Sequence, residues 1–67
     1  MGKEHPSTAT TYNNIAVVYD KQGKFEDALE YYKKALNIFE KVLGMEHPYT
    51  ITVYNNIAWL NNKLGRS

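Results

Sequence analysis

Apolar residues recur at helical spacing along the middle of the chain, and they form two adjacent stripes. The first stripe is Phe25, Ala28, Leu29, Tyr32, Leu36, Phe39 and Leu43, and the second is Tyr31, Ala35, Ile38 and Val42. At about 100° per residue the two stripes cover roughly half of the circumference, which is wider than the single stripe of a surface helix. The pattern therefore predicts one continuous helix over 25–43 that packs against two neighbours.

Charged residues near the ends of this segment agree with a helix. Glu26 and Asp27 lie in the expected first turn and Lys41 lies in the last, where each charge is favourable against the helix macrodipole. Gly44 follows, and glycine is the usual left-handed residue after a helix. Both boundaries of the helix are thus marked in the sequence.

The segments on either side of this helix repeat each other. The stretch HPSTATTYNNIA at 5–16 returns as HPYTITVYNNIA at 47–58, an offset of 42 residues. Each copy opens with a proline, which suits the first position of a helix, and a fixed period of this length indicates stacked supersecondary units. We therefore expect an all-α fold, a helix hairpin plus a third helix, with helices at about 6–22, 25–43 and 48–64 in a single domain over 1–67.

The repeated residues resemble a known family. Tyr12-x-x-Ile15-Ala16-x-x-Tyr19, followed by Ala28-x-x-x-Tyr32, is similar to the pattern W-x2-L-G-x2-Y…A-x3-F of tetratricopeptide repeats. The resemblance implies about one and a half repeats of a right-handed superhelix, with small residues where helices cross closely. On this basis the expected repeat core is Tyr12, Ile15, Ala16, Tyr19, Ala28, Tyr32, Ala35, Tyr54 and Ala58.

The unit departs from the common repeat in two ways. The common repeat has 34 residues and a closing proline, whereas this unit has 42 residues, an HPxT entry and an EKVLG exit. In this it is similar to the repeats of kinesin light chains and of related arrays in bacterial and fungal signalling proteins. The third helix is also not a faithful copy of the first, since Asn61 stands where Tyr19 stands one period earlier.

Family resemblance further implies a concave groove that binds extended peptides or partner helices. The residues expected there are Asn13, Asn14, Val17, Asp20, Lys21, Asn55, Asn56, Trp59, Asn62 and Lys63. Asparagine is a poor helix former, and its side-chain amide can both donate to and accept from a peptide backbone. The alternative is that these amides cap or bridge neighbouring helices. A carboxylate clamp for chaperone C-termini is not expected, because the corresponding positions lack Lys and Arg.

Composition narrows the classes of function. The 67 residues contain no Cys and carry a formal net charge of +1, which excludes disulfides and gives no basic patch for nucleic acid or an anionic membrane. No apolar run approaches the roughly 20 residues of a membrane span, and a cytoplasmic protein is expected. His5 and His47 are interpreted as helix-entry residues, since a third and fourth metal ligand are missing. We expect no enzyme activity and no cofactor.

The third helix leads us to expect self-association. Repeats bury their faces only against neighbours, so about three are normally needed for stability, and this helix has no successor here although it is more apolar than the first. A homodimer is expected through Val53, Ile57, Trp59, Leu60 and Leu64, and straightening at Gly23 would permit domain swapping. The hypothesis is a protein-interaction module that binds a protein or peptide and self-associates. The alternative is an excised or designed repeat fragment that only forms homo-oligomers.

Overall fold

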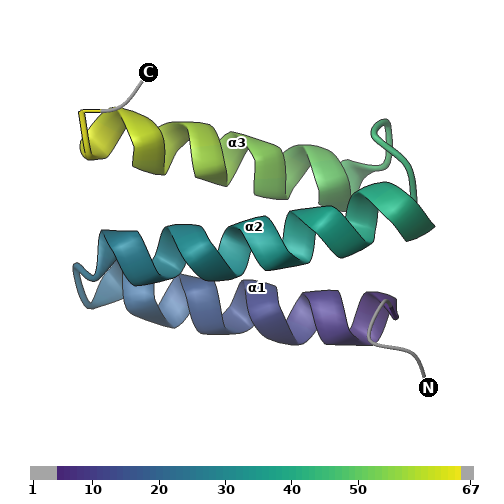
Figure 1. Cartoon of the computed structure of the whole chain (residues 1–67), viewed down its shortest axis with the longest axis horizontal. Helices are drawn as coiled ribbons and strands as arrows, with labels where there is room; N and C mark the ends of the chain where they lie inside the picture. The colour runs from purple at the N-terminus through teal and green to yellow at the C-terminus, as the bar shows by residue number, and fades with distance from the viewer. Residues whose placement is uncertain (1–4, 66–67) are drawn as a thin grey trace.

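The computed structural model describes residues 5–65, and this range folds into three α-helices (Figure 1). They are α1 (Pro6–Lys21), α2 (Phe25–Val42) and α3 (Pro48–Lys63). The predicted all-α hairpin plus a third helix is confirmed. Each helix ends one residue before its predicted boundary, because the last residue of each prediction is the C-cap, Gln22, Leu43 or Leu64.

Helices α1 and α3 begin in the same way, with histidine as the N-cap and proline at the first position. The Nδ1 atom of His5 accepts a hydrogen bond from the backbone N–H of Ser7 at 3.0 Å, and that of His47 accepts one from Tyr49 at 3.1 Å. Each ring nitrogen thus satisfies one of the amides that a helix start leaves unpaired. This confirms the interpretation of both histidines as helix-entry residues.

A glycine in the left-handed region ends α1. Gly23 has φ +79°, and its N–H donates to the Asp20 carbonyl at 3.0 Å while the N–H of Lys24 donates to the Tyr19 carbonyl at 2.9 Å. This pair of bonds is the Schellman motif, which uses the free carbonyls of the last helical turn. It reverses the chain within three residues, so that α2 returns along α1.

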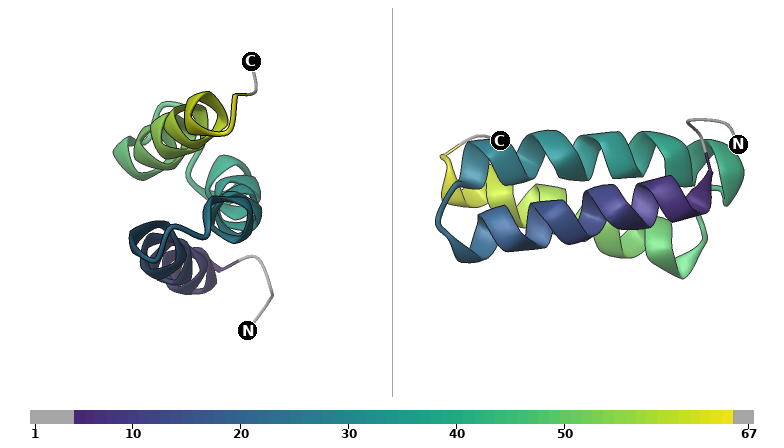
Figure 2. Two further views of the ribbon diagram at one scale, coloured as in Figure 1. Left: turned by 90° about the vertical axis from the view of Figure 1, so that its left-hand side faces the viewer. Right: turned by 90° about the horizontal axis from the view of Figure 1, so that it is seen from below.

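Helix α2 lies between the other two helices and packs against both (Figure 1). In the end-on view of Figure 2, α1 and α3 both lie on one side of α2, so the three helices form an open V. The chain runs antiparallel from each helix to the next, and α1 and α3 therefore run parallel. This arrangement confirms that the two-sided apolar surface of α2 has two neighbours.

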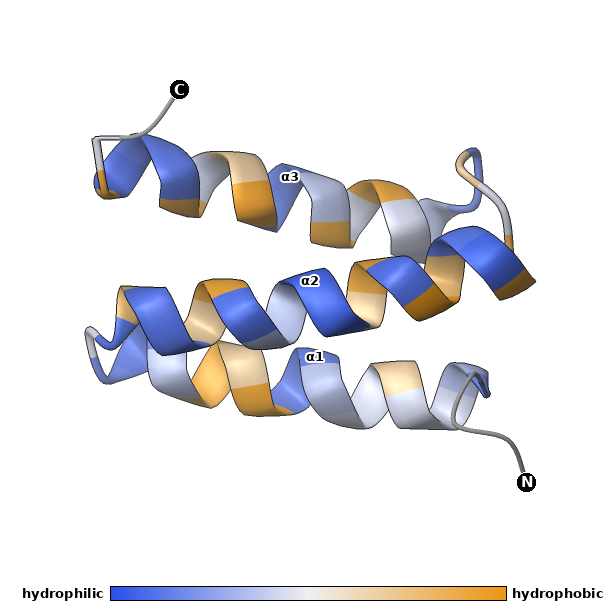
Figure 3. Ribbon diagram, viewed as in Figure 1, coloured by the Kyte–Doolittle hydropathy of each residue, from blue (hydrophilic) through white to orange (hydrophobic). Residues whose placement is uncertain are grey.

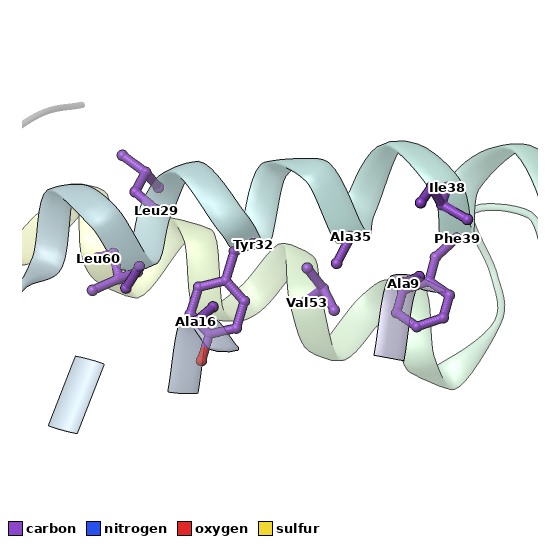
Figure 4. Packing of buried hydrophobic residues seen from close by; sticks show 10 residues of the cluster. Ala9, Ala16, Leu29, Tyr32, Ala35, Ile38, Phe39, Val53 and Leu60 are labelled. Carbon is purple, nitrogen blue, oxygen red and sulfur yellow. The ribbon is translucent and has the colours of Figure 1, made fainter. Parts of the chain in front are cut away.

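The core is built on α2 and uses small residues where helices meet. Ala9 and Ala16 of α1 and Ala28 and Ala35 of α2 are all fully buried. The larger members of the cluster are Leu29, Tyr32, Ile38, Phe39, Val53 and Leu60 (Figure 4). Because alanine adds little beyond the backbone, α1 and α2 approach closely along this line of contact.

The predicted core is wrong for two residues of α3. Tyr54 is 55% exposed and Ala58 is exposed, although Ala16, the equivalent of Ala58, is fully buried. The reason is that α3 meets α2 with a different face from the one that α1 uses. Tyr12, Ile15 and Tyr19 are partly buried, and the remaining predicted core residues of α1 and α2 are buried.

The same geometry corrects the residues predicted for self-association. Val53 is 2% exposed and Leu60 is fully buried, because both pack against α2. Ile57 and Leu64 also pack against this core and are partly buried. Figure 3 shows several apolar bands of α3 on the edge turned toward α2 and others on the opposite edge. Of the predicted set, Trp59 remains about half exposed.

Candidate peptide-binding groove

The inner side of the V formed by the three helices contains a pocket of about 360 Å³. Thr10 and Asn13 of α1 form one wall, Phe39 of α2 lies between, and Tyr49, Thr52 and Val53 of α3 form the other wall. The pocket thus combines an apolar floor with polar side chains on both sides. We call the channel between α1 and α3 that contains this pocket the groove.

On the α1 wall, one polar atom lacks a partner. The Oδ1 atom of Asn13 is buried and accepts no hydrogen bond within residues 5–65. The neighbouring Thr10 hydroxyl is already used, since it donates to the Pro6 carbonyl at 3.0 Å. A buried acceptor without a partner is costly, so the Asn13 amide is the polar group of this wall that would gain from a bound donor.

On the α3 wall, Tyr49 is held by aromatic contacts on two sides. Its ring centroid lies 5.9 Å from that of Phe39 and 4.9 Å from that of His47. His47 is itself held by its capping bond to the backbone of Tyr49. The helix start therefore positions an aromatic side chain at the mouth of the pocket, where its ring stays accessible.

The groove continues past the pocket toward the C-terminal ends of α1 and α3. Residues 7 and 11 positions further along a helix return to the same face, which places Val17 and Lys21 in line with Thr10, and Trp59 and Lys63 in line with Thr52. Trp59 meets Phe25 edge-on at 6.2 Å, and the Lys63 ammonium lies 5.2 Å from the Trp59 ring centroid. This end of the groove is therefore apolar with a basic rim.

Tyr32 belongs to α2 and is buried in the core beneath α1. Burial disfavours its ionised form, and the nearby Asp20 carboxylate adds repulsion, so the pKa of Tyr32 is raised above its ordinary value. Asp20 was predicted to face the groove, and the structure places it partly buried, close enough to Tyr32 to act on its charge.

The structure separates the predicted groove residues into different environments. Asn13 lines the pocket, whereas Val17, Asp20 and Asn56 are partly buried outside it, and Asn14, Lys21, Asn55, Trp59, Asn62 and Lys63 are exposed. The prediction did not include Phe39 and Tyr49, which line the pocket. Phe39 was assigned only to the core stripe of its helix. In the sequence, the feature that could have pointed to Tyr49 as a pocket residue is its place directly after the repeated His-Pro.

Other kinds of site find no support among the described residues. Within residues 5–65, no three His, Cys, Asp or Glu side chains lie together as metal ligands would. Across the same range, no helix has both the length and the apolar content to cross a membrane.

A family model described as tetratricopeptide repeat matches residues 7–67. The chain belongs to the tetratricopeptide repeat family. No curated protein matches it.

Membership of the tetratricopeptide repeat family explains the arrangement of the helices. The pair α1–α2 forms one repeat, and α3 is the first helix of a second repeat, 42 residues later. Tetratricopeptide repeats are scaffolds for protein–protein interaction and are generally without catalytic activity. The similarity to the kinesin light chain variety stays a prediction.

Proposed function

We propose that this tetratricopeptide repeat chain binds an extended segment of a partner protein in the groove between α1 and α3. The observation that supports the proposal is the pocket of about 360 Å³ with the unpaired Asn13 acceptor in its wall. Binding pockets are typically concave and largely apolar, with a few polar groups that orient the ligand. Helices of 16 residues are about 24 Å long, which matches about seven residues of extended peptide.

Each end of the groove suits a different part of such a peptide. The exposed ring of Tyr49, above the buried Phe39 at the floor of the pocket, would take an apolar side chain, and the Asn13 amide can accept from a backbone N–H. At the other end, Trp59 offers a second apolar surface beside the ammonium group of Lys63. A segment with apolar side chains and an acidic residue toward the Trp59 end fits this distribution.

The chain provides its own probe for this proposal, because Trp59 is the sole Trp and lies in the groove. A displayed library of random peptides selects ligands, and Trp59 fluorescence then measures their affinity. Asn13→Ala should weaken binding about 5–10-fold, since one hydrogen bond contributes on the order of 1 kcal/mol.

Asn55→Ala is the matched control for Asn13→Ala. It makes the same change in the same Tyr-Asn-Asn context, but at an exposed position outside the pocket. We expect its affinity to equal that of the parent chain. Equal losses in the two variants, or a library that selects no peptide, would contradict the proposal.

We also propose that the chain self-associates through α3. The supporting observation is that Ile51 and Tyr54, neighbours on one face of this helix, are each about half exposed. Contiguous apolar surface on a small soluble domain commonly marks an interface. Light scattering after gel filtration tests this, and a monomer at every concentration would contradict it.

A further inference from the structure

One face of α3 is largely apolar and open to solvent. It consists of Ile51, Tyr54, Ala58 and Asn61, which we call the outer face of α3. Ile51 is 46% exposed, and a hollow of about 190 Å³ lined by Met45, Thr50, Ile51 and Tyr54 lies at one end of the face. Thr50 is fully buried at this hollow, and its hydroxyl has no hydrogen-bond partner within residues 5–65.

The outer face corresponds to the face with which α1 packs against α2. At the repeat offset its residues align with Ala9, Tyr12, Ala16 and Tyr19. The two alanines are fully buried, and the two tyrosine rings lie 5.9 and 5.7 Å from the ring of Tyr31. In α1, this face is therefore covered by another helix, whereas no segment of residues 5–65 covers the equivalent outer face of α3.

Two substitutions make the outer face unsuited to a helix like α2. Ile51 replaces Ala9, which is fully buried because α2 passes close to it, so the larger side chain would hold a similar helix away. Asn61 replaces Tyr19, whose ring stacks on Tyr31 at an interplanar angle of 27°, and an amide cannot reproduce that contact. Compared with the equivalent face of α1, the outer face of α3 therefore has a larger side chain at position 51 and a smaller one at position 61.

We propose that the outer face binds the outer face of a second copy of this chain, with the two α3 helices antiparallel. In this arrangement Tyr54 packs against the partner's Ala58, and Ile51 packs against the partner's Asn61. Both pairs are centred on position 56 in the sequence, so a single two-fold axis that crosses the outer face at this level of the helix satisfies them together. Each large side chain then faces a smaller one, which lets the two helices interdigitate.

The charges of α3 favour this orientation. Lys63 is the one charged residue within α3, and its ammonium lies over the Trp59 ring on the groove side. The outer face itself is uncharged, which is typical of interface centres. In an antiparallel pair the positive end of each helix dipole lies beside the partner's negative end. Glu46, just before α3, then lies at the same end of the pair as the partner's Lys63.

This inference rests on the proposed self-association and adds to it the face and the orientation. The first experiment compares the parent chain, Ala58→Arg and Val18→Arg by light scattering over a concentration series. Val18 is the matched control, because it is an exposed apolar residue of α1, at 54% exposure, far from the outer face. Circular dichroism verifies that each variant keeps its helix content.

Ala58→Arg should raise the dissociation constant of the dimer at least about tenfold, because a charge enters an uncharged interface without a partner. Val18→Arg should associate like the parent chain. Loss of association in both variants alike would show a general charge effect and overturn the assignment of the face.

A second experiment tests the orientation, and the absence of Cys in the sequence makes it direct. Ile51→Cys and Asn61→Cys are prepared separately, mixed, and oxidised gently. An antiparallel pair gives the mixed disulfide between positions 51 and 61, which its mass identifies. A parallel pair would instead give disulfides between identical positions.

The outcomes separate this inference from the proposals before it. A parent chain that stays monomeric at millimolar concentration would remove self-association altogether. Association that survives Ala58→Arg, or disulfides between identical positions, would leave self-association standing and overturn the face or the orientation. If a synthetic peptide of residues 24–44 bound the parent chain but not Ala58→Arg, the occupant would be a helix like α2. Peptide binding in the groove is measured in a separate experiment, from the fluorescence of Trp59.

Discussion

At the scale of single residues, buried alanines decide how closely the helices approach. Ala9 and Ala16 of α1 and Ala28 and Ala35 of α2 are fully buried in the core. Larger side chains at these positions would separate the helices and disturb the aromatic contacts of Tyr31 with Tyr12 and Tyr19 on the outer edge of the pair. At position 58 no helix of residues 5–65 lies opposite the alanine, and its side chain is exposed.

Tyr32 gives a pH-dependent prediction. Burial, with a smaller contribution from Asp20, raises its pKa in the folded chain above the ordinary 10.0. As pH rises past about 10, the unfolded chain loses this proton first, so the contribution to stability is complete below that pH and is lost above it. The difference in free energy of unfolding between the parent chain and Tyr32→Phe should therefore decrease above pH ~10.

The measurement for Tyr32 is a series of urea titrations from neutral to alkaline pH on both chains. All other side chains are common to both chains, so their contributions cancel in the difference. A difference that stays constant to pH ~11 would show that Tyr32 ionises alike in the folded and unfolded chain.

At the scale of elements, α1 and α3 start with the same two residues, a histidine N-cap followed by a proline. His5 and His47 each accept a hydrogen bond from the amide two residues later. Replacing either by alanine should lower the free energy of unfolding by about 0.5–2 kcal/mol, the usual cost of losing an N-cap. Thermal or urea unfolding measures the change.

The matched replacement by asparagine distinguishes capping from other roles of the two histidines. Asparagine is a strong N-cap residue, so His5→Asn and His47→Asn should retain most of the parent stability. If the asparagine and alanine variants were equally destabilised, the ring contact of His47 with Tyr49 would be the more important interaction at that site.

At the scale of the whole molecule, α2 is the shared centre and α3 depends on it. Leu60 is fully buried against this core, so Leu60→Ala should cost about 2–5 kcal/mol. Since repeat units contact only their neighbours, the loss should fall on α3, whose amides should exchange with solvent faster than those of α1 and α2. Hydrogen exchange resolves the helices.

Tyr54→Ala is the control for Leu60→Ala on the same helix. Tyr54 is 55% exposed, so at concentrations low enough to keep the chain monomeric its replacement should change stability by about 0.5 kcal/mol or less. A large loss at Tyr54 together with a small one at Leu60 would mean that α3 packs on α2 with its other face.

Much of the groove could not be predicted from the sequence. The asparagines were recognised by their repetition and poor helix propensity, yet Asn13 lines the pocket while Asn55, in the identical local sequence, is exposed outside it. The pocket also requires Phe39 and Tyr49, which belong to different helices. Their proximity depends on the angle between α2 and α3, which no local pattern encodes.

The sequence by itself determined the three helices, their ends and the two-sided character of α2, because helical periodicity, proline, glycine and N-caps act locally. Tertiary structure alone decided which face of each outer helix is buried. The identical segments Tyr-Asn-Asn-Ile-Ala at 12–16 and 54–58 show this directly, since Ala16 is fully buried and Ala58 is exposed. Burial depends on what lies opposite, and α2 meets one face of α1 and a different face of α3.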